Sequence, residues 1–107
     1  MELYSVNITD TALADMESIY NYIAEILLAP ESAIRQYNRI AEAILSLNTF
    51  PQRYPLFDLE PEHSWNIRKM VVDNYLVCYI VDSDKVTVTD VLYGASNVHN
   101  RLNRRHR

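Results

Sequence analysis

The spacing of apolar residues changes once along this 107-residue chain, and that change constrains its fold more than any other feature. From Asp10 to Leu47, apolar side chains recur every three or four positions, as on one face of an amphipathic helix. From Trp65 to Tyr93 they follow a period of two, which is typical of strands. Helices that come as a block before hairpin-linked strands predict an α+β fold.

The N-terminal half predicts one strand and two helices. Leu3–Ile8 alternates and is expected to form a short strand, after which Asp10 can cap a helix. Helical stripes then run from Ala12 to Leu27 and from Ala33 to Leu47. Pro30 cannot continue the first helix but is tolerated at the start of the second. So short a connection predicts an antiparallel helical hairpin.

The C-terminal half predicts a loop and a three-stranded meander. Residues 51–64 hold three prolines and no hydrophobic period, so they are expected to form a loop. The expected strands and turns are Trp65–Val72, Asp73-Asn74, Tyr75–Val81, Asp82-Ser83-Asp84 and Lys85–Tyr93. Gly94, the single glycine, is expected where the backbone takes an unusual angle. After Asn97 we expect a short helix or an extended arm.

These elements predict a single domain over residues 1–107, in which the N-terminal strand and the helical hairpin pack on a small antiparallel sheet. The one cysteine, Cys78, lies in a charge-free strand and is expected to be a buried, inert thiol. No apolar run is long enough to cross a bilayer, and no secretory signal is evident, so we expect a cytoplasmic protein.

Charge is unevenly distributed along the chain. The net charge is −4, but residues 1–64 carry −7 and residues 65–107 carry +3. Arg101, Arg104, Arg105 and Arg107 all lie in the last seven residues. A local cationic segment can bind a polyanion at short range even on an acidic protein. The alternative is a solvated chain end without a partner.

Several sequence blocks, taken in order, resemble the RelE/ParE superfamily of toxins from bacterial type II toxin–antitoxin modules. The blocks are Tyr4–Thr9 with Ala12 and Asp15, Ile19-Tyr20-x-Tyr22-Ile23, Ile44-x-x-Leu47 to Phe50-Pro51, Ile67-Arg68, Tyr75-x-Val77-x-Tyr79 and Val91–Gly94. The resemblance covers nearly the whole chain and implies a β-α-α-β-β-β fold. The paired long helices and the Phe50-Pro51 helix end are closer to the ParE-like branch.

The resemblance implies a growth-inhibiting toxin of the plasmid-stabilisation type that a cognate antitoxin neutralises. ParE-like members poison DNA gyrase, whereas RelE-like members cut messenger RNA on the ribosome. The expected partners are therefore an antitoxin and either DNA gyrase or the ribosome with its mRNA, with a homodimer or a hetero-oligomer with antitoxin as the assembly. A third alternative is an antitoxin-binding domain without toxicity, which the acidic balance favours.

RNA cleavage without a metal needs a base, an acid and a cation for the phosphate. Arg68 stands where the family commonly carries an arginine, and its fork can bind two phosphate oxygens. Its alternatives are an ion pair with Asp73 or Asp90 and a purely structural role. His99 titrates near neutrality and is the candidate for proton transfer, unless it is a plain surface histidine. Glu62 could act as a base with Arg68, although most loop acids are simply solvated.

Two residues depart from the nuclease pattern. Tyr93 stands where many members have a histidine, and Ser96 stands where an arginine is common. A tyrosine can donate a hydrogen bond or stack on a base, but with a pKa near 10 it is a poor proton shuttle at neutral pH. For target or nucleic-acid binding, the expected residues are Arg68, Tyr93, Arg101, Arg104 and Arg105. We expect no cofactor and no metal, because the adjacent Glu60, Glu62 and His63 are unsuited to one ion.

Partner binding is expected to use the sheet edge and an apolar groove, since antitoxins of such toxins typically dock a helix and sometimes a strand there. The acidic helical residues Asp15, Glu17, Glu25, Glu31 and Glu42 would suit a basic partner, or form a solvated face. We further expect Arg68 and the C-terminal arginines to lie side by side on one open face.

Overall fold

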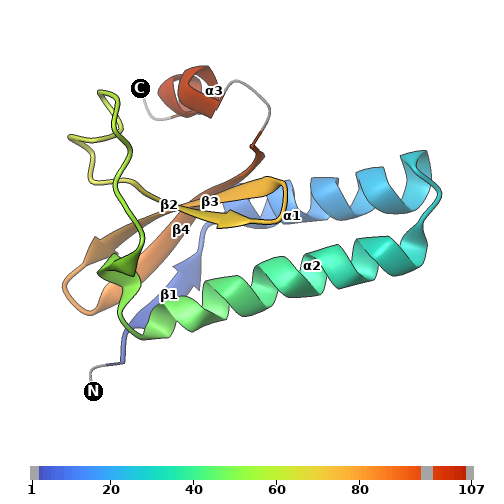
Figure 1. The fold of residues 1–107 in the computed structure, drawn as a ribbon, viewed down its shortest axis with the longest axis horizontal. Helices are drawn as coiled ribbons and strands as arrows, with labels where there is room; N and C mark the ends of the chain where they lie inside the picture. The colour runs from blue at the N-terminus through green and yellow to red at the C-terminus, as the bar shows by residue number, and fades with distance from the viewer. Residues whose placement is uncertain (1–2, 95–97, 106–107) are drawn as a thin grey trace.

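The computed structural model describes residues 3–94 and 98–105 and confirms the α+β fold (Figure 1). A helical hairpin covers one face of a four-stranded sheet, and a short C-terminal helix packs on the other face. The elements in chain order are β1 (Ser5–Ile8), α1 (Asp10–Asn21), the π-helical turn η1 (Tyr22–Ile26), α2 (Pro30–Leu45), the 3-10 turns η2 (Ser46–Asn48) and η3 (Pro51–Arg53), β2 (Arg68–Val72), β3 (Tyr75–Asp82), β4 (Lys85–Tyr93) and α3 (Val98–Arg105).

The sheet has the strand order β1-β4-β3-β2. The three later strands form the expected antiparallel meander. β1 differs, because it pairs in parallel with β4, with Ser5 opposite Lys85, so the sheet is mixed. Two parallel strands need a long connection between them. Here α1, α2, β2 and β3 lie between β1 and β4 along the chain.

The sheet separates two apolar cores. The larger core joins Met16 and Ile40 of the hairpin to Val77 and Tyr79 of β3. The smaller core lies on the opposite face, where Leu102 of α3 packs with three sheet-side residues, Ile67, Cys78 and Leu92. β3 is therefore covered on both faces, as its charge-free sequence predicts.

The first helix begins one residue earlier than predicted. Thr9, not Asp10, is the N-cap, and its hydroxyl oxygen accepts a hydrogen bond from the backbone N–H of Ala12 at 3.1 Å. Asp10 is the first helical residue, where a carboxylate still favours the positive end of the helix dipole. Pro30 begins α2, as expected.

The turn between the helices uses a leucine where a glycine is usual. After η1, the N–H of Ala29 donates to the carbonyl of Ile23 at 3.0 Å, one residue further back than in a Schellman helix end, because the preceding turn is π-helical. The residue inside that turn, Leu28, has a φ of 55°. The end of the first helix before Pro30 was predicted, but no glycine marks this turn, so the left-handed conformation of Leu28 was not.

β2 is shorter than expected and begins at Arg68 rather than Trp65. Asn66 has a φ of 60°, which interrupts the extended backbone ahead of the strand. The preceding loop then pairs with the outer edge of β2: the N–H of Lys69 donates to Pro55, and the N–H of Phe57 donates to Ile67, both at 3.0 Å. This loop therefore covers the first part of the sheet edge.

Gly94 follows β4, but not for the expected reason, because its φ is not positive. Its N–H donates to the carbonyl of Asn74 at 2.8 Å. A Cβ atom at this position would lie 3.2 Å from the same oxygen. The missing side chain thus allows a close approach between two backbones.

Candidate functional site

Arg68, the expected phosphate-binding residue, is half-buried on the hairpin side of the sheet. It shares that face with Met70 and lies opposite Tyr79 of β3. Its Nη1 atom donates hydrogen bonds to the carbonyl oxygens of Tyr54, at 2.7 Å, and Gln52, at 3.2 Å. The guanidinium therefore fastens the η3 segment to the sheet.

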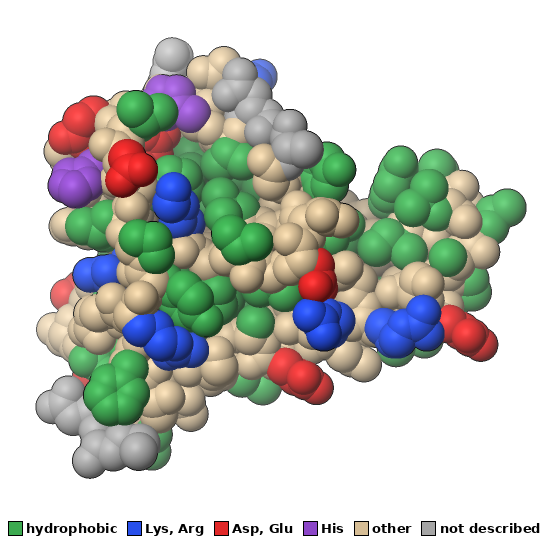
Figure 2. Space-filling model, in the orientation of Figure 1, with side chains coloured by type: hydrophobic (Ala, Val, Ile, Leu, Met, Phe, Trp, Pro, Cys, Tyr) green, Lys and Arg blue, Asp and Glu red, His purple; other side chains and the backbone are tan. Residues whose placement is uncertain are grey.

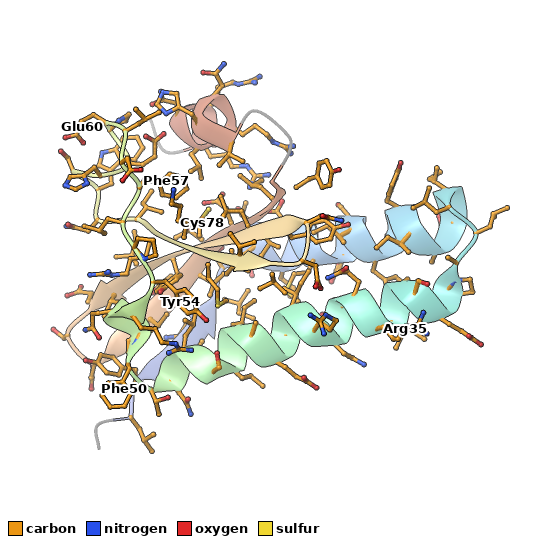
Figure 3. The ribbon with its side chains drawn as sticks, in the orientation of Figure 1. Arg35, Phe50, Tyr54, Phe57, Glu60 and Cys78 are labelled. Carbon is orange, nitrogen blue, oxygen red and sulfur yellow. The ribbon has the colours of Figure 1, made fainter. Side chains whose placement is uncertain are left out.

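Tyr79 contributes to the same fastening. Its hydroxyl donates to the carbonyl of Pro51 at 2.6 Å, and burial raises the pKa of Tyr79 to about 12. Figure 3 shows the neighbouring Tyr54 side chain between the sheet and the hairpin. Two side chains from adjacent strands thus bind three carbonyl groups of one short segment, which is a structural role for Arg68.

The acids proposed as alternative partners of Arg68 bind other arginines. Arg39 of α2 donates to both carboxylate oxygens of Asp73, at 2.7 and 2.8 Å, and these bonds lower the pKa of Asp73. Asp90 accepts from Arg105 at 2.8 Å. The expected ion pair of Arg68 with Asp73 or Asp90 was therefore wrong.

Glu62 and His99 meet on the opposite face of the sheet. Glu62 is fully buried, at 0 % exposure, so the prediction of a solvated loop acid was wrong. Nδ1 of His99, on α3, lies 2.9 Å from Oε1 of Glu62. The two atoms are within ion-pair distance but are not aligned for a hydrogen bond. Among the described residues, no side chain or backbone group donates a hydrogen bond to either carboxylate oxygen of Glu62.

Arg105 ties α3 to both α1 and β4. Its Nη1 atom lies 2.8 Å from Asp15 and 2.8 Å from Asp90, and its Nη2 atom donates to Asp15 at 2.9 Å. Hydrogen bonding to Asp15 is the main cause of a raised pKa for the Arg105 guanidinium. Asp90 has no exposed surface, so this cation compensates a buried charge.

Asp15 has a structural role that sequence reasoning missed, because it was expected to face a basic partner or to belong to a solvated acidic face. Besides binding Arg105, its carboxylate accepts the backbone N–H of Val91 at 3.0 Å, beyond the point where β1 stops pairing with β4. The signal was its spacing, because Asp15 falls three residues after the buried Ala12 and next to the buried Met16. An acid on the apolar stripe needs a partner.

The other C-terminal arginines are open to solvent. Arg101 and Arg104 are exposed and line a shallow hollow of about 480 Å³ with Arg105. Because α3 packs on the face opposite the hairpin, these side chains do not join Arg68. Among the described residues, the expected single face combining Arg68 with Arg101, Arg104 and Arg105 is not formed, and Arg107 lies outside those residues.

Tyr93 borders a larger cleft between α1, the ends of β3 and β4, and α3. The cleft has a volume of about 720 Å³, and its walls include Tyr22, Tyr75, Tyr93 and Arg101. Tyr93 is 49 % exposed and its ring packs edge-on against Tyr75, with centroids 5.9 Å apart. Partial burial, followed by the neighbouring tyrosines, raises the pKa of Tyr75. The cleft thus offers aromatic faces beside the guanidinium groups of Arg101 and Arg105.

The single cysteine of the chain lies in the smaller core. Cys78 is buried as expected, and burial raises the pKa of its thiol (Figure 3). Within residues 3–94 and 98–105, no three His, Cys, Asp or Glu side chains are grouped to hold a metal ion. None of the described helices is long and apolar enough to span a membrane.

The sequence matches one family over most of its length. Residues 6–98 match the family model described as the ParE toxin of the type II toxin–antitoxin system parDE. No curated protein matches the chain.

A solved structure from a toxin–antitoxin system shows the same fold. A chain of the chromosomal ParDE toxin–antitoxin system from P. aeruginosa superposes with a TM-score of 0.71 at 19 % identity, covering 85 % of this chain and 96 % of that one. A conserved hypothetical protein from Helicobacter pylori gives a TM-score of 0.49 at 15 % identity, covering 84 % and 93 %.

Proposed function

The chain belongs to the ParE toxin family of type II toxin–antitoxin systems, and from this premise we propose that it arrests growth by binding DNA gyrase. In this proposal it acts in the cytoplasm and is neutralised by a cognate antitoxin. The fold is shared by toxins with different targets, so the choice of gyrase over messenger RNA depends on the site.

One observation carries this choice: the sheet lies between Arg68 and the Glu62–His99 pair. Metal-free cleavage of RNA needs the phosphate-binding cation and the proton-transfer groups around one phosphate. Here Arg68 is engaged by the carbonyls of Gln52 and Tyr54 on the hairpin face, whereas His99 lies on the α3 face. A surface for binding a protein does not need these groups together.

Binding is supported by the exposed groups on the α3 side. Tyr93 and Arg101 border the same cleft, and Arg104 lies beside it in the neighbouring hollow. Tyrosine and arginine are the side chains most enriched among the residues that carry binding energy in protein interfaces. We assign target contact to these three residues and leave Arg68 and Arg105 as structural residues.

The test compares two reactions in parallel. The purified chain is added to a gyrase supercoiling reaction and, separately, to a translating extract with a reporter mRNA. We expect inhibited supercoiling, accumulation of cleaved DNA held by gyrase, and intact mRNA. Co-expression with the antitoxin should restore growth and relieve the inhibition.

Charge-reversal variants locate the contact. Replacing Arg101→Glu together with Arg104→Glu should weaken gyrase inhibition while leaving the fold intact. Lys85→Glu reverses an exposed charge at the far end of β4 and serves as the matched control. If both variants inhibit gyrase equally well, the α3 side of the molecule does not contact gyrase.

A nuclease is the second candidate, because Glu62 and His99 are in contact. A carboxylate at Nδ1 can orient an imidazole so that Nε2 accepts a proton. Cut mRNA that disappears with His99→Gln, and no trapped DNA, would favour this candidate. No growth arrest on expression, with antitoxin binding retained, would indicate a binding domain without toxicity.

A further inference from the structure

The end of the helical hairpin gathers large apolar side chains that the fold leaves exposed. We call residues 22–28 the hairpin tip. Tyr22 is 54 % exposed, Ile26 68 %, Leu27 55 % and Leu28 80 %. The tip projects away from the sheet (Figure 1), and Figure 2 shows hydrophobic side chains gathered at this end of the molecule. Tyr22 and Leu27 also line the cleft that contains Tyr93.

Leu28 is not explained by the stability of the fold. Its φ of 55° lies in the left-handed region, which disfavours a side chain and is usually occupied by glycine at a helix end. Almost the whole residue faces solvent, so its side chain gains little from packing in the isolated chain. Backbone strain at an exposed bulky residue points to a use outside the fold.

The charges around the tip restrict what can cover it. Residues 22–34 include the acids Glu25 and Glu31, and the exposed Arg35 follows one helical turn after Glu31, so residues 22–35 carry two acids against one base. Both acids lie next to the exposed apolar residues along the chain, so a nucleic acid would be repelled. A second copy of the tip would bring like charges together. The surface that fits is an apolar pocket with a basic rim on another protein.

We propose that the hairpin tip inserts Leu28 and its apolar neighbours into a basic-rimmed pocket of DNA gyrase. This inference rests on the proposed function and names the surface that performs it. An enzyme that binds DNA carries lysine and arginine side chains on the surface that contacts the phosphates. The acidic tip complements such a surface, and the cleft that Tyr22 and Leu27 line adjoins it.

The decisive variant is Leu28→Gly, because it separates binding from stability. Glycine removes the anchor side chain and relieves the left-handed backbone, so the melting temperature should stay the same or rise. The concentration for half-inhibition of supercoiling should increase by about tenfold or more, the loss typical of an anchor side chain. Leu45→Ala removes a comparably exposed leucine, 65 % exposed, at the other end of α2 and should leave inhibition unchanged.

The role of the acids beside the hairpin tip is tested with a double variant that carries Glu25→Gln and Glu31→Gln. Opposite charges attract less as salt screens them, so inhibition by the wild type should weaken with rising salt. The double variant should inhibit less at low salt and lose most of that salt dependence. Unchanged salt dependence would remove the basic rim from the proposal.

The outcomes distinguish this inference from the function beneath it. If the wild type does not inhibit gyrase, both the proposed function and the proposed contact of the hairpin tip are wrong. If the wild type inhibits and Leu28→Gly inhibits equally well, only the proposed contact of the hairpin tip is wrong. If Leu28→Gly instead abolishes a concentration-dependent dimer seen by light scattering, with inhibition intact, the tip binds a second copy and the proposal is overturned.

Discussion

Nδ1 of His99 lies 2.9 Å from Oε1 of Glu62, a carboxylate with no exposed surface. This contact joins α3 to the loop that precedes β2. The His99 side chain is itself 38 % exposed, so it links a buried acid to the surface. Loss of the histidine would leave the acid buried without this neighbour, which is costlier than removing both groups.

We therefore expect His99→Ala to lower the free energy of unfolding by about 1–3 kcal/mol, measured by denaturant titration at neutral pH. The double variant with Glu62→Gln should recover part of that loss, because an amide is cheaper to bury than a carboxylate. Additive losses in the double-mutant cycle would show that the two groups do not interact.

Arg105 should matter far more for stability than its neighbours in α3. Arg105→Ala leaves Asp15 and the buried Asp90 without their cation, so we expect a loss of about 2–3 kcal/mol, below the range for a fully buried pair because Arg105 is partly exposed. Arg104→Ala should change stability by less than about 0.5 kcal/mol. Similar unfolding midpoints for the two variants would contradict the arrangement.

The Arg39–Asp73 pair should add an acid-sensitive contribution to stability. Bonding to Arg39 lowers the pKa of Asp73 from its usual 3.8, so the folded state is favoured above that value. The contribution is lost as the pH falls through the lowered pKa. The stability difference between wild type and Asp73→Asn should therefore be constant at neutral pH and shrink in acid below about pH 4.

Asn is a suitable replacement because it tolerates the left-handed backbone of Asp73, whose φ is 55°. When both proteins also carry Arg39→Gln, the stability difference caused by Asp73→Asn should depend less on pH. A residual dependence is expected because Gln36 also donates to Asp73, at 3.0 Å. An unchanged pH profile in that background would exclude Arg39 as the main cause.

Cys78 provides a reporter for the docking of α3. Burial raises the pKa of its thiol, and thiolate is the reactive form, so alkylation of the folded protein should be much slower than that of the unfolded chain. Leu102 of α3 packs in the same core. His99→Ala should therefore speed labelling, measured by mass spectrometry, before global unfolding occurs. Rapid labelling of the native wild type would contradict this packing.

The sequence was sufficient for the architecture because the apolar periods differ so clearly. The helical stripes around Pro30 and the alternating strands located the main elements and their order. Periodicity carries no information on partner strands that are distant in sequence, so the parallel pairing of β1 with β4 was not foreseen. The left-handed backbone of Leu28 was also missed, because leucine rarely adopts it. That of Asn66 was missed because the residue lies in an alternating pattern that predicts a strand.

The sequence singled out individual candidate residues but not their grouping. Family resemblance drew attention to Arg68 and Glu62, and the general titration range of histidine drew attention to His99. Whether they act together depends on which face of the sheet each one occupies, and a shift of one residue in a strand reverses that face. The shortening of β2 and the packing of α3 on the far side are tertiary outcomes, as is the use of Asp15 to hold Arg105.

The parallel pairing of β1 with β4 also orders the events of biosynthesis. Ser5 is translated long before Lys85, the residue that it faces in β4. A nascent chain therefore cannot complete this sheet until β4 has been made, and contacts between segments this remote in sequence form slowly. A fragment released before β4 would lack the assembled sheet.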